Sequence, residues 1–316
     1  MKCLVTGAAG FIGSHLCDAL LARGDEVIGV DCFLDTYPQE VKERNLAGAR
    51  RHRAFACFKA DLLTADLDQL LKHVDVVFHL AAQPGVRSSW GESFAGYVEN
   101  NILATQRLLE AVAKRPVRKF VFASSSSIYG NATELPLRED TIPEPISPYG
   151  VTKLAAEHLC QVYHSQWGVP TIALRYFTVY GPRQRPDMAF HQWIRALLSG
   201  ETVTIFGDGK QTRDFTFVAD IVRANLLAAG CSESGVVANI AGGSRVTVLE
   251  TVRLLEQITG APGRVSFTES AKGDVRDTWA DTTRAKEVLG FSPQVDLATG
   301  LAAEVEWLQE QAIGDR

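Results

Sequence analysis

The chain has 316 residues, of which 46% are hydrophobic and 22% charged, so it can bury a core and lacks the composition of a disordered protein. Its formal net charge of -5 argues against binding of nucleic acid, because proteins that grip phosphates carry a basic surplus. No apolar run approaches the ~18 residues that would cross a membrane, and Gly7 comes too early for a signal peptide.

The six cysteines form no C-x-x-C pair, and the seven histidines do not cluster at the spacing of metal ligands. We therefore expect reduced thiols in a cytoplasmic protein, without a disulfide framework and without a metal site. Cys3 and Cys17 fall inside apolar patterns and are predicted to be small core residues.

The first half of the chain alternates short apolar runs with helical patterns. Strands are predicted over residues 3–6, 26–31, 55–61, 74–82, 119–124 and 171–176, and helices over residues 13–23, 97–114 and 148–167. Most of these strands are nearly continuous in apolar residues, as in parallel strands buried on both faces. The alternation predicts a doubly wound α/β sheet.

The second half is less regular. Strands are predicted over residues 203–206 and 236–240, and helices over residues 218–230, 248–258, 282–289 and 301–311. Four prolines break the rest into loops: Pro182, Pro186, Pro262 and Pro293. No repeat and no linker separates the halves, so we expect them to pack as one unit with a cleft between them.

A glycine-rich segment, Gly7-Ala-Ala-Gly10-Phe-Ile-Gly13, follows the first predicted strand and opens the first predicted helix. Its glycines let the backbone turn tightly and approach a pyrophosphate, which then faces the free N–H groups of the helix. The spacing differs from the common G-x-G-x-x-G, and the alternative is a simple tight turn. The position between strand and helix favours a dinucleotide site, with Phe11 and Ile12 as further contacts.

Two carboxylates lie where predicted strands end. Asp31 ends the second strand, where a carboxylate accepts hydrogen bonds from an adenosine ribose diol and repels a 2′-phosphate. Cys32 and Phe33 follow it and offer no arginine for a phosphate, so NAD is favoured over NADP. Asp61 and Leu62, after the third strand, are candidates for contact with adenine; the alternative for Asp61 is a helix cap.

The segment Ser147-Pro-Tyr149-Gly-Val-Thr-Lys153 carries the main catalytic candidates. Ser147 suits a helix N-cap and Pro148 the first helical position. Tyr149 and Lys153 then lie four residues apart on one helix face. A tyrosine with a pKa of ~10 is a poor base at neutral pH, but a neighbouring ammonium and a cationic nicotinamide would both lower that pKa.

Further motifs continue along the chain. They are His79-Leu-Ala-Ala82, Asn101-Ile-Leu-Ala-Thr105, Ser124-Ser-Ser-Ser-Ile-Tyr129-Gly130, Arg175-Tyr-Phe-Thr-Val-Tyr-Gly-Pro182 and Phe206-Gly-Asp-Gly-Lys-Gln-Thr-Arg213-Asp-Phe215. With them the chain resembles, over its whole length, the extended short-chain dehydrogenases/reductases of the nucleotide-sugar epimerase/dehydratase family. The resemblance implies a Rossmann domain for NAD, formed by residues 1–175 and about 215–243, and a smaller α/β substrate domain, formed by residues 176–214 and 244–316.

The same resemblance assigns roles to single positions. Ser125 matches the catalytic Ser/Thr that hydrogen-bonds O4 of the sugar. Tyr149 removes the O4 proton while hydride leaves C4 for NAD, and Lys153 holds the nicotinamide ribose and supports the phenolate. The other positions on the cofactor side are Thr6, Ile12, Leu80, Ala81, Ala82, Asn101 and Tyr176.

For the diphosphate of the substrate the resemblance points to arginines. Arg213 matches the usual contact to the ribose and diphosphate, and Gln211 lies in the same motif. Arg87 lies in a loop after the carboxyl end of a strand, where such sites form. The alternative is that Arg87 is a solvated surface arginine without a ligand. Arg276 is a further candidate, which either contacts the diphosphate or pairs with neighbouring acids.

The residues after Ser125 separate the reactions of the family. Its dehydratases carry Asp-Glu directly after the catalytic Thr, and its decarboxylases of UDP-glucuronate carry a Glu in that stretch. Here the stretch reads Ser125-Ser126-Ser127-Ile128 and supplies no acid for either chemistry. What remains is oxidation at C4, rotation of the keto-sugar and return of hydride to its other face, which is 4-epimerisation.

Thr178 indicates which sugar is used. The common UDP-glucose/galactose 4-epimerases carry Asn there, whereas FTVYGP followed by RPDMA looks most like the UDP-glucuronate 4-epimerases, with Tyr176 in place of their usual Phe. Ser126, Ser127 and Thr178 offer neutral donors for a C6 carboxylate, although the serines also fit a polar strand-to-loop transition. Arg185 lies near the uracil or diphosphate by resemblance, or pairs with Asp187 at the surface.

Two other functions stay open. One is 4-epimerisation of UDP-glucose or UDP-N-acetylglucosamine, and the other is a non-catalytic dinucleotide-binding regulator, which would be expected to lack Ser125, Tyr149 or Lys153. Apolar residues at helical spacing on helices 97–114 and 148–167 fit the four-helix bundle through which the family forms homodimers. We therefore expect a homodimer that binds a UDP-sugar, and neither nucleic acid nor a membrane.

Overall fold

The computed structural model describes residues 1–314; residues 315 and 316, which end the predicted substrate domain, lie outside the described part. Its centre is a seven-stranded sheet in the order β11-β6-β5-β4-β1-β2-β3, with all neighbours parallel. The loops that follow the strands therefore meet at one edge of the sheet. The strands are β1 (Lys2–Thr6), β2 (Glu26–Asp31), β3 (Phe55–Lys59), β4 (Val76–His79), β5 (Lys119–Ser125), β6 (Thr171–Tyr176) and β11 (Val236–Ile240).

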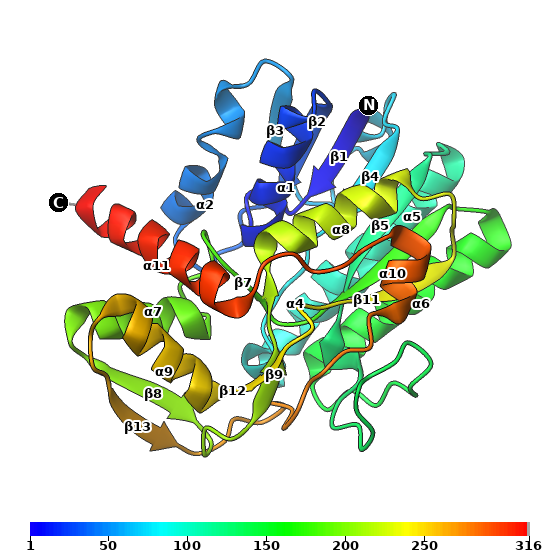
Figure 1. Cartoon of the computed structure of the whole chain (residues 1–316). Helices are drawn as coiled ribbons and strands as arrows, with labels where there is room; N and C mark the ends of the chain where they lie inside the picture. The colour runs from blue at the N-terminus through cyan, green and yellow to red at the C-terminus, as the bar shows by residue number, and fades with distance from the viewer. Residues whose placement is uncertain (315–316) are drawn as a thin grey trace.

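Helices cover both faces of this sheet, which confirms the predicted doubly wound α/β fold (Figure 1). On one face, α1 (Phe11–Ala22) and α8 (Val218–Gly230) share an apolar core with the inward side chains of the strands. On the other face, α5 (Ala104–Lys114) and α6 (Pro148–Trp167) close a second core. Cys3 and Cys17 are fully buried in the first core, and all six cysteines are free thiols.

The edge strand β3 does not follow the expectation of strands buried on both faces. Phe55 and Cys57 are half-buried, whereas Phe58 is 48% exposed. The reason is position, because an edge strand has one neighbour in the sheet and here pairs only with β2. The predicted run 55–61 also ends early, at Lys59, and the run 74–82 shrinks to β4.

The predicted helix 97–114 is not one continuous α-helix. It consists of α4 (Phe94–Tyr97), a π-helical turn (Val98–Leu103) and α5. In that turn the Asn101 side chain points inward, where it accepts the Gln83 N–H at 2.7 Å and donates to Thr152 Oγ1 at 2.9 Å. A π-turn widens the helix by one residue and is often found beside functional sites.

Helix α6 begins and ends where the sequence predicts. The Ser147 hydroxyl accepts the Gly150 N–H at 3.1 Å, Pro148 occupies the first turn, and Gly168 ends the helix in the left-handed region with φ of 68°. The helix thus begins directly beside the strand ends of the sheet and carries Tyr149 and Lys153 in its first two turns.

A smaller group of elements lies beside the sheet and has its own apolar core. Here β8 (Thr202–Phe206) and β13 (Arg264–Thr268) pair in parallel against α7 (Ala189–Ser199), α9 (Val248–Thr259) and α11 (Leu297–Gly314). The second half of the chain also contains two pairs of short strands, β7 (Val179–Tyr180) with β10 (Thr216–Phe217) and β9 (Thr212–Asp214) with β12 (Arg245–Thr247), and helix α10 (Thr283–Leu289). The first half contains the further helices α2 (Gln39–Leu46) and α3 (Leu67–Leu70).

The sequence analysis did not predict β13, α7, the short strands β7, β9, β10 and β12, or the helices α2 and α3 of the first half. The paired strands β7, β9, β10 and β12 have two or three residues, too few to show an apolar period. Helix α7 lies in a stretch that the prolines 182 and 186 had indicated as loop, and it begins only after them. The predicted helix 301–311 starts earlier, at Leu297.

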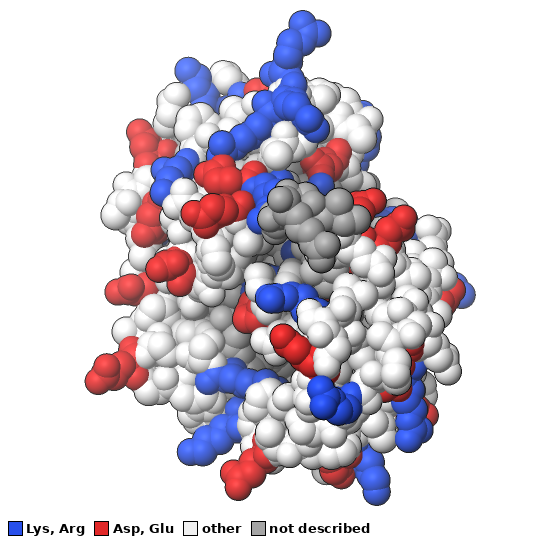
Figure 2. Space-filling model, turned by 90° about the vertical axis from the view of Figure 1, so that its left-hand side faces the viewer, with Lys and Arg blue, Asp and Glu red and all other residues white. Residues whose placement is uncertain are grey.

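The surface in Figure 2 shows acidic and basic side chains interspersed over one face, without a large patch of one sign. This agrees with the small net charge of the chain. Within residues 1–314, no helix has both the length and the apolar character needed to cross a membrane.

Candidate active site

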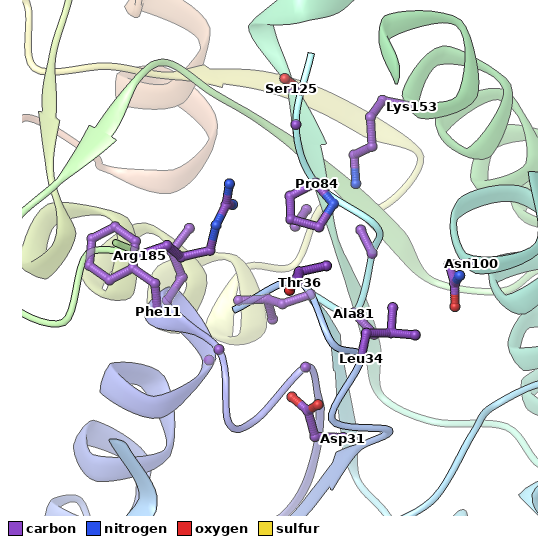
Figure 3. A pocket seen from close by; sticks show the side chains of 18 of the residues that line it. Phe11, Asp31, Leu34, Thr36, Ala81, Pro84, Asn100, Ser125, Lys153 and Arg185 are labelled. Carbon is purple, nitrogen blue, oxygen red and sulfur yellow. The ribbon is translucent and has the colours of Figure 1, made fainter. Parts of the chain in front are cut away.

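A cavity of about 440 Å³ opens at the carboxyl ends of the sheet strands and collects most of the predicted site residues (Figure 3). Ligand sites of open parallel sheets form at this edge. Figure 3 shows Asp31 toward one end of the cavity and Ser125 with Lys153 toward the other. The predicted residues that line it are Gly7, Gly10, Phe11, Ile12, Gly13, Asp31, Asp61, Leu62, Leu80, Ala81, Ala82, Ser125, Ser126, Ser127, Tyr149, Lys153, Tyr176, Thr178 and Arg185.

The glycine segment forms a tight backbone cradle. Gly7 has a positive φ of 70°, and a Cβ there would lie 2.8 Å from the Ala81 nitrogen. A Cβ on Gly13 would lie 2.1 Å from the Gly7 carbonyl oxygen, so a side chain is excluded. No side chain caps α1, which begins after Gly10, and its first N–H groups are left for a ligand. This arrangement fits a pyrophosphate.

Asp31 ends β2 and is held in place by the backbone around it. Its carboxylate accepts the Ala9 N–H at 3.0 Å and the Phe33 N–H at 2.8 Å. The side chain therefore ties the glycine segment to the end of β2 and faces the cavity in one orientation. A fixed carboxylate at this place suits the two hydroxyls of a ribose.

Asp61 lies in the turn after β3 and lines the cavity together with Leu62. Its carboxylate accepts the Leu63 N–H at 2.9 Å. The next helix, α3, is capped by Asp66, which accepts the Gln69 N–H at 3.0 Å. The alternative interpretation, that Asp61 caps the next helix, is therefore wrong, because Asp66 caps α3.

Ser125, Tyr149 and Lys153 come together from β5 and α6. The Ser125 hydroxyl accepts the Ser127 N–H at 3.1 Å and lies close enough to the Tyr149 hydroxyl to affect its pKa. Burial raises the pKa of Tyr149, while the Ser125 hydroxyl and the positive charge of Arg185 lower it. The sequence suggested Lys153 as the cation that lowers this pKa, and the structure adds a second cation, Arg185, whose charge acts on Tyr149.

Lys153 is buried, with 4% of its surface exposed. Its ammonium lies 4.7 Å from the centre of the Phe122 ring, and burial lowers its pKa to about 8. Glu157, one helical turn further along α6, acts in the opposite direction and favours the charged form. The ammonium is therefore poised to lose or share its proton close to neutral pH.

A buried ion pair lies behind these groups. Arg175 of β6 contacts Glu157 of α6 at 2.6 Å, and the Ser124 hydroxyl donates to the same carboxylate at 2.6 Å. Arg175 also donates to the Tyr129 hydroxyl at 2.7 Å. These bonds join β5, β6 and α6, the three elements that carry Ser125, Tyr176 and Tyr149. The sequence placed Arg175 in a motif but did not show its partner.

The comparison with known proteins decides the family. The model of the NAD dependent epimerase/dehydratase family matches residues 3–241, about three quarters of the chain. The chain belongs to this family. An uncharacterised UDP-glucose epimerase of Bacillus subtilis (strain 168) is 48% identical over 317 residues, which is 100% of both chains. A UDP-glucuronate 4-epimerase of Thermodesulfobacterium geofontis is 37% identical over 97% of this chain and 96% of its own.

A solved structure is similar to this chain in both sequence and fold. The crystal structure of UDP-glucuronic acid 4-epimerase from Bacillus cereus, in complex with UDP-glucuronic acid and NAD, has a TM-score of 0.96 and 47% identity. The match covers 98% of this chain and 100% of that one. The two chains therefore share both the parallel sheet and the smaller group of elements beside it.

In this epimerase/dehydratase chain, hydroxyl groups and one arginine surround the part of the cavity beyond Tyr149. Ser126 and Ser127 lie in a short turn after β5, and Thr178 follows β6. Arg185 lines the same cavity and also pairs with Asp187 at 2.7 Å, while its contact with the uracil or diphosphate stays a prediction.

Three predicted arginines lie outside the cavity lining, beside one another. Arg87 pairs with Asp274 at 2.7 Å and stacks 3.9 Å from the centre of the Phe206 ring. Arg276 pairs with Asp208 at 2.8 Å. Arg213 donates to the backbone carbonyl of Arg276 at 3.1 Å, and the nearby charges that act on it include those of Arg87 and Asp274.

Three further predicted residues, Thr6, Gln211 and Asn101, also lie off the lining, and the Thr6 hydroxyl contacts the buried His79 ring at 2.7 Å. Gln211 donates to the Phe206 carbonyl at 2.6 Å, and its buried Oε1 has no partner. Asn101 joins the loop after β4 to α6, and its neighbour Asn100 lines the cavity instead. The π-helical turn is the reason, because it rotates Asn101 inward and brings Asn100 to the lining.

The remaining lining residues were missed by the sequence analysis. Seven of the sixteen come from the loops after β2 and β4, and the others lie in or near other strands and helices. They are Val30, Cys32, Leu34, Thr36, Tyr37, Lys42, Ala60, Pro84, Gly85, Val86, Asn100, Ala104, Ala123, Ser124, Val179 and Met188. For the seven loop residues, the available signal was their position after strand ends.

Proposed function

We propose that the protein is an NAD-dependent UDP-glucuronate 4-epimerase. The observation that carries the proposal is the content of one cavity: it joins the glycine cradle to Ser125, Tyr149 and Lys153. The acidic side chains among its lining residues are Asp31, which Figure 3 shows at the end away from Ser125, and Asp61, which follows the edge strand β3. Dehydration and decarboxylation thus lack an acid near the sugar, and 4-epimerisation needs none.

The cradle fits NAD. The glycine segment and the uncapped start of α1 would hold the pyrophosphate, and Asp31 would accept the hydroxyls of the adenosine ribose. Leu80, Ala81 and Tyr176 would line the remainder of the cofactor site. When bound, NAD takes up a hydride from C4 of the sugar and gives it back.

The proton steps belong to Tyr149. We infer that its phenolate takes the O4 proton and returns it after the keto-sugar has rotated. Ser125 orients O4 through the hydroxyl that also contacts Tyr149. Burial works against the phenolate, so the positive charge of Arg185 and the ammonium of Lys153 are needed to favour it.

The hydroxyl groups around the sugar support glucuronate as the substrate. Oxidation at C4 of a glucuronate gives a β-keto acid, which loses CO₂ when the carboxylate bond aligns with the ketone π system. Ser126, Ser127 and Thr178 would hold the C6 carboxylate in another orientation by hydrogen bonds, without supplying a proton.

The arginine cluster beside the cavity would bind the diphosphate. Arg87, Arg213 and Arg276 lie together, but Arg87 and Arg276 each hold a carboxylate. A diphosphate would have to replace Asp274 and Asp208 as their partner. Both ion pairs are half-exposed, and exposed pairs contribute only about 0–1 kcal/mol, so this exchange costs little.

The same proposal states which part of the chain binds which ligand and how two copies of the chain assemble. Residues 1–175 and about 215–243 would bind NAD, and residues 176–214 and 244–316 would bind the UDP part, in a cytoplasmic protein. A homodimer would form through a four-helix bundle of α5 and α6, because Val151 and Val162 on α6 are 46% and 52% exposed. A light-scattering mass near 34.5 kDa would contradict the dimer.

The test is a proton NMR time course of the purified protein with UDP-glucuronate and catalytic NAD. We expect UDP-galacturonate without UDP-xylose. UDP-xylose as the main product would contradict the reading of the serine segment. No conversion of UDP-glucuronate, together with conversion of UDP-glucose or UDP-N-acetylglucosamine, would favour the second candidate, to which the name of the Bacillus subtilis relative points.

A further inference from the structure

Glu304 is a buried acid that the chemistry described above does not use. It lies on α11, in the apolar core of the smaller group of elements, and none of its surface is exposed. Its Oε2 accepts the Gly181 N–H at 2.7 Å, while its Oε1 has no hydrogen-bond partner. None of the ion pairs within residues 1–314 includes it.

The groups around Glu304 offer no positive charge. Tyr180 is a titratable neighbour, and its pKa is raised by burial and by the negative charges of Glu304, Asp296 and Asp220. Burial likewise raises the pKa of Glu304 well above its usual range, opposed only by the Gly181 N–H. Burial therefore disfavours the charged form of this carboxyl group, whose role in the structure is that of a hydrogen-bond acceptor.

The backbone that Glu304 holds leads directly into the cavity. Gly181 directly follows β7 and has a φ of 132°, and a Cβ there would lie 2.9 Å from Phe217, so the turn is closely packed. Four residues later, Arg185 enters the cavity beside Tyr149. Figure 1 shows α11 running past β7, and Gly300 of α11 packs against the Tyr180 ring.

Other anchors of this loop come from α7, where the Gln184 side chain accepts the His191 N–H at 3.0 Å, and from the cofactor side. His15 of α1 bonds the Pro182 carbonyl at 2.8 Å, and Asp18 of α1 pairs with Arg183 at 2.8 Å. Glu304 supplies the anchor from α11. The loop is thus stretched between the helix that begins at the glycine cradle and the last helix of the chain.

We propose that Glu304 is a positioning residue of the active site: from α11 its buried side chain holds the Gly181–Arg185 loop, so that the Arg185 guanidinium faces Tyr149. Without this acceptor the Gly181 N–H is buried and unpaired, which costs enough free energy for the loop to move toward water. Displacement of Arg185 removes a positive charge that favours the Tyr149 phenolate.

The test uses the full-length protein with NAD and compares three variants. Glu304→Leu keeps the volume and removes the acceptor. Glu304→Gln keeps an acceptor oxygen at the same position and carries no charge. Glu306→Gln changes an exposed acid on the same helix and serves as the control. The readouts are kcat, KM, the pH profile of kcat/KM, thermal unfolding and NAD binding.

We expect Glu304→Leu to lower kcat/KM about ten- to a hundredfold, because small misplacements in an active site have effects of this size. Its acidic limb should move to higher pH, since the pKa of Tyr149 rises when Arg185 withdraws. The groups that face Tyr149 are Ser125 from β5, Tyr97 from α4 and Arg185 from the loop, with Lys153 on the next turn of α6, and only Arg185 is displaced. Glu304→Gln and Glu306→Gln should behave like the unmodified protein.

Three results would overturn the proposal. They are an unchanged pH profile and kcat/KM in Glu304→Leu, a loss of thermal stability alone, or an equal loss of activity in Glu304→Gln. If Glu304→Leu does not fold, Glu304→Asp withdraws the carboxyl by one methylene and is judged by the same readouts.

The inference rests on the proposed function, and the two fail in different ways. If the unmodified protein epimerises another UDP-sugar, the substrate assignment falls, and the Glu304 variants are measured with that sugar.

Discussion

The two ends of the cavity differ in whether backbone or long side chains surround them. The cofactor end consists of backbone and strand ends: Gly7 and Gly13 allow no side chain, and Asp31 is fixed by two N–H groups. Beside the other end, outside the lining, lie long side chains that pair with one another: Arg87 with Asp274 and Arg276 with Asp208. The cofactor end is rigid before any ligand arrives, whereas these arginines would have to exchange partners to bind the proposed diphosphate.

This difference matches what each end has to do. A dinucleotide that stays bound through each turnover needs a fixed cradle, and a backbone cradle loses no side-chain entropy when it is filled. A substrate that enters and leaves needs contacts that open at low cost. Half-exposed ion pairs meet that need, because water and salt weaken them.

The largest effect is expected between the two ends, at Tyr149. Tyr149→Phe removes the proposed base but keeps the ring, which packs 6.3 Å from the Tyr97 ring. Turnover should fall about 10²–10⁴-fold, the usual contribution of a general acid–base group, while NAD and UDP-sugar still bind. Measured kcat with separate titrations of both ligands checks this. Retained turnover would mean that another group takes the proton.

A buried histidine beneath the cofactor end should make stability depend on pH. His79 lies between the Thr6 and Thr105 hydroxyls, at 2.7 and 2.9 Å, and burial lowers its pKa to about 3. The unfolded chain takes up a proton near pH 6.5 and the native one does not, so stability is present above pH 6.5 and is lost as the pH falls toward 3. The expected loss is ~1.4 kcal/mol per pH unit in that window.

Urea unfolding at pH 7, 6 and 5 measures this slope. His79→Gln should be less stable at pH 7 but should show a smaller loss on acidification. His158→Gln, at an exposed position of α6, is the control and should keep the original slope. An unchanged slope in His79→Gln would show that other groups, such as His15, whose pKa burial lowers to about 4, account for it.

The rigidity of the cofactor end is tested at Gly13. A methyl group there would overlap the Gly7 carbonyl, and overpacking costs about 1–3 kcal/mol. Gly13→Ala should therefore weaken NAD binding about ten- to a hundredfold in a calorimetric titration. Gly230→Ala, on α8 with nothing near its Cβ, should leave the affinity unchanged. Full affinity in Gly13→Ala would show that the cradle is adaptable after all.

The smallest effect is expected at the substrate end. Asp274→Asn should free Arg87 and lower KM for the UDP-sugar about two- to fivefold, since an exposed ion pair contributes at most ~1 kcal/mol. Arg87→Ala should instead raise KM. Asp68→Asn breaks a comparable exposed pair with Arg115, outside the cavity, and should have no effect. If Asp274→Asn raises KM, the carboxylate helps to bind substrate and does not compete with it.

The sequence alone determined the parts that depend on short-range chemistry. Strand–helix alternation predicted the parallel sheet, and the caps Ser147 and Gly168 define α6 within the chain itself. The glycine segment was readable because its requirement is local: tight turns and close approach admit no other residue. Tyr149 and Lys153 were readable because the period of one helix places them on one face.

Only the tertiary structure decided the contacts between distant segments. Arg87 meets Asp274, Arg276 meets Asp208, and Glu304 meets Gly181 across more than sixty positions of the chain in every case. Such contacts leave no periodic pattern in the sequence, because they depend on how strands of two or three residues and long loops pack. Asn101 shows the same limit within a helix, since the inserted residue of a π-turn changes which of two neighbouring asparagines faces the cavity.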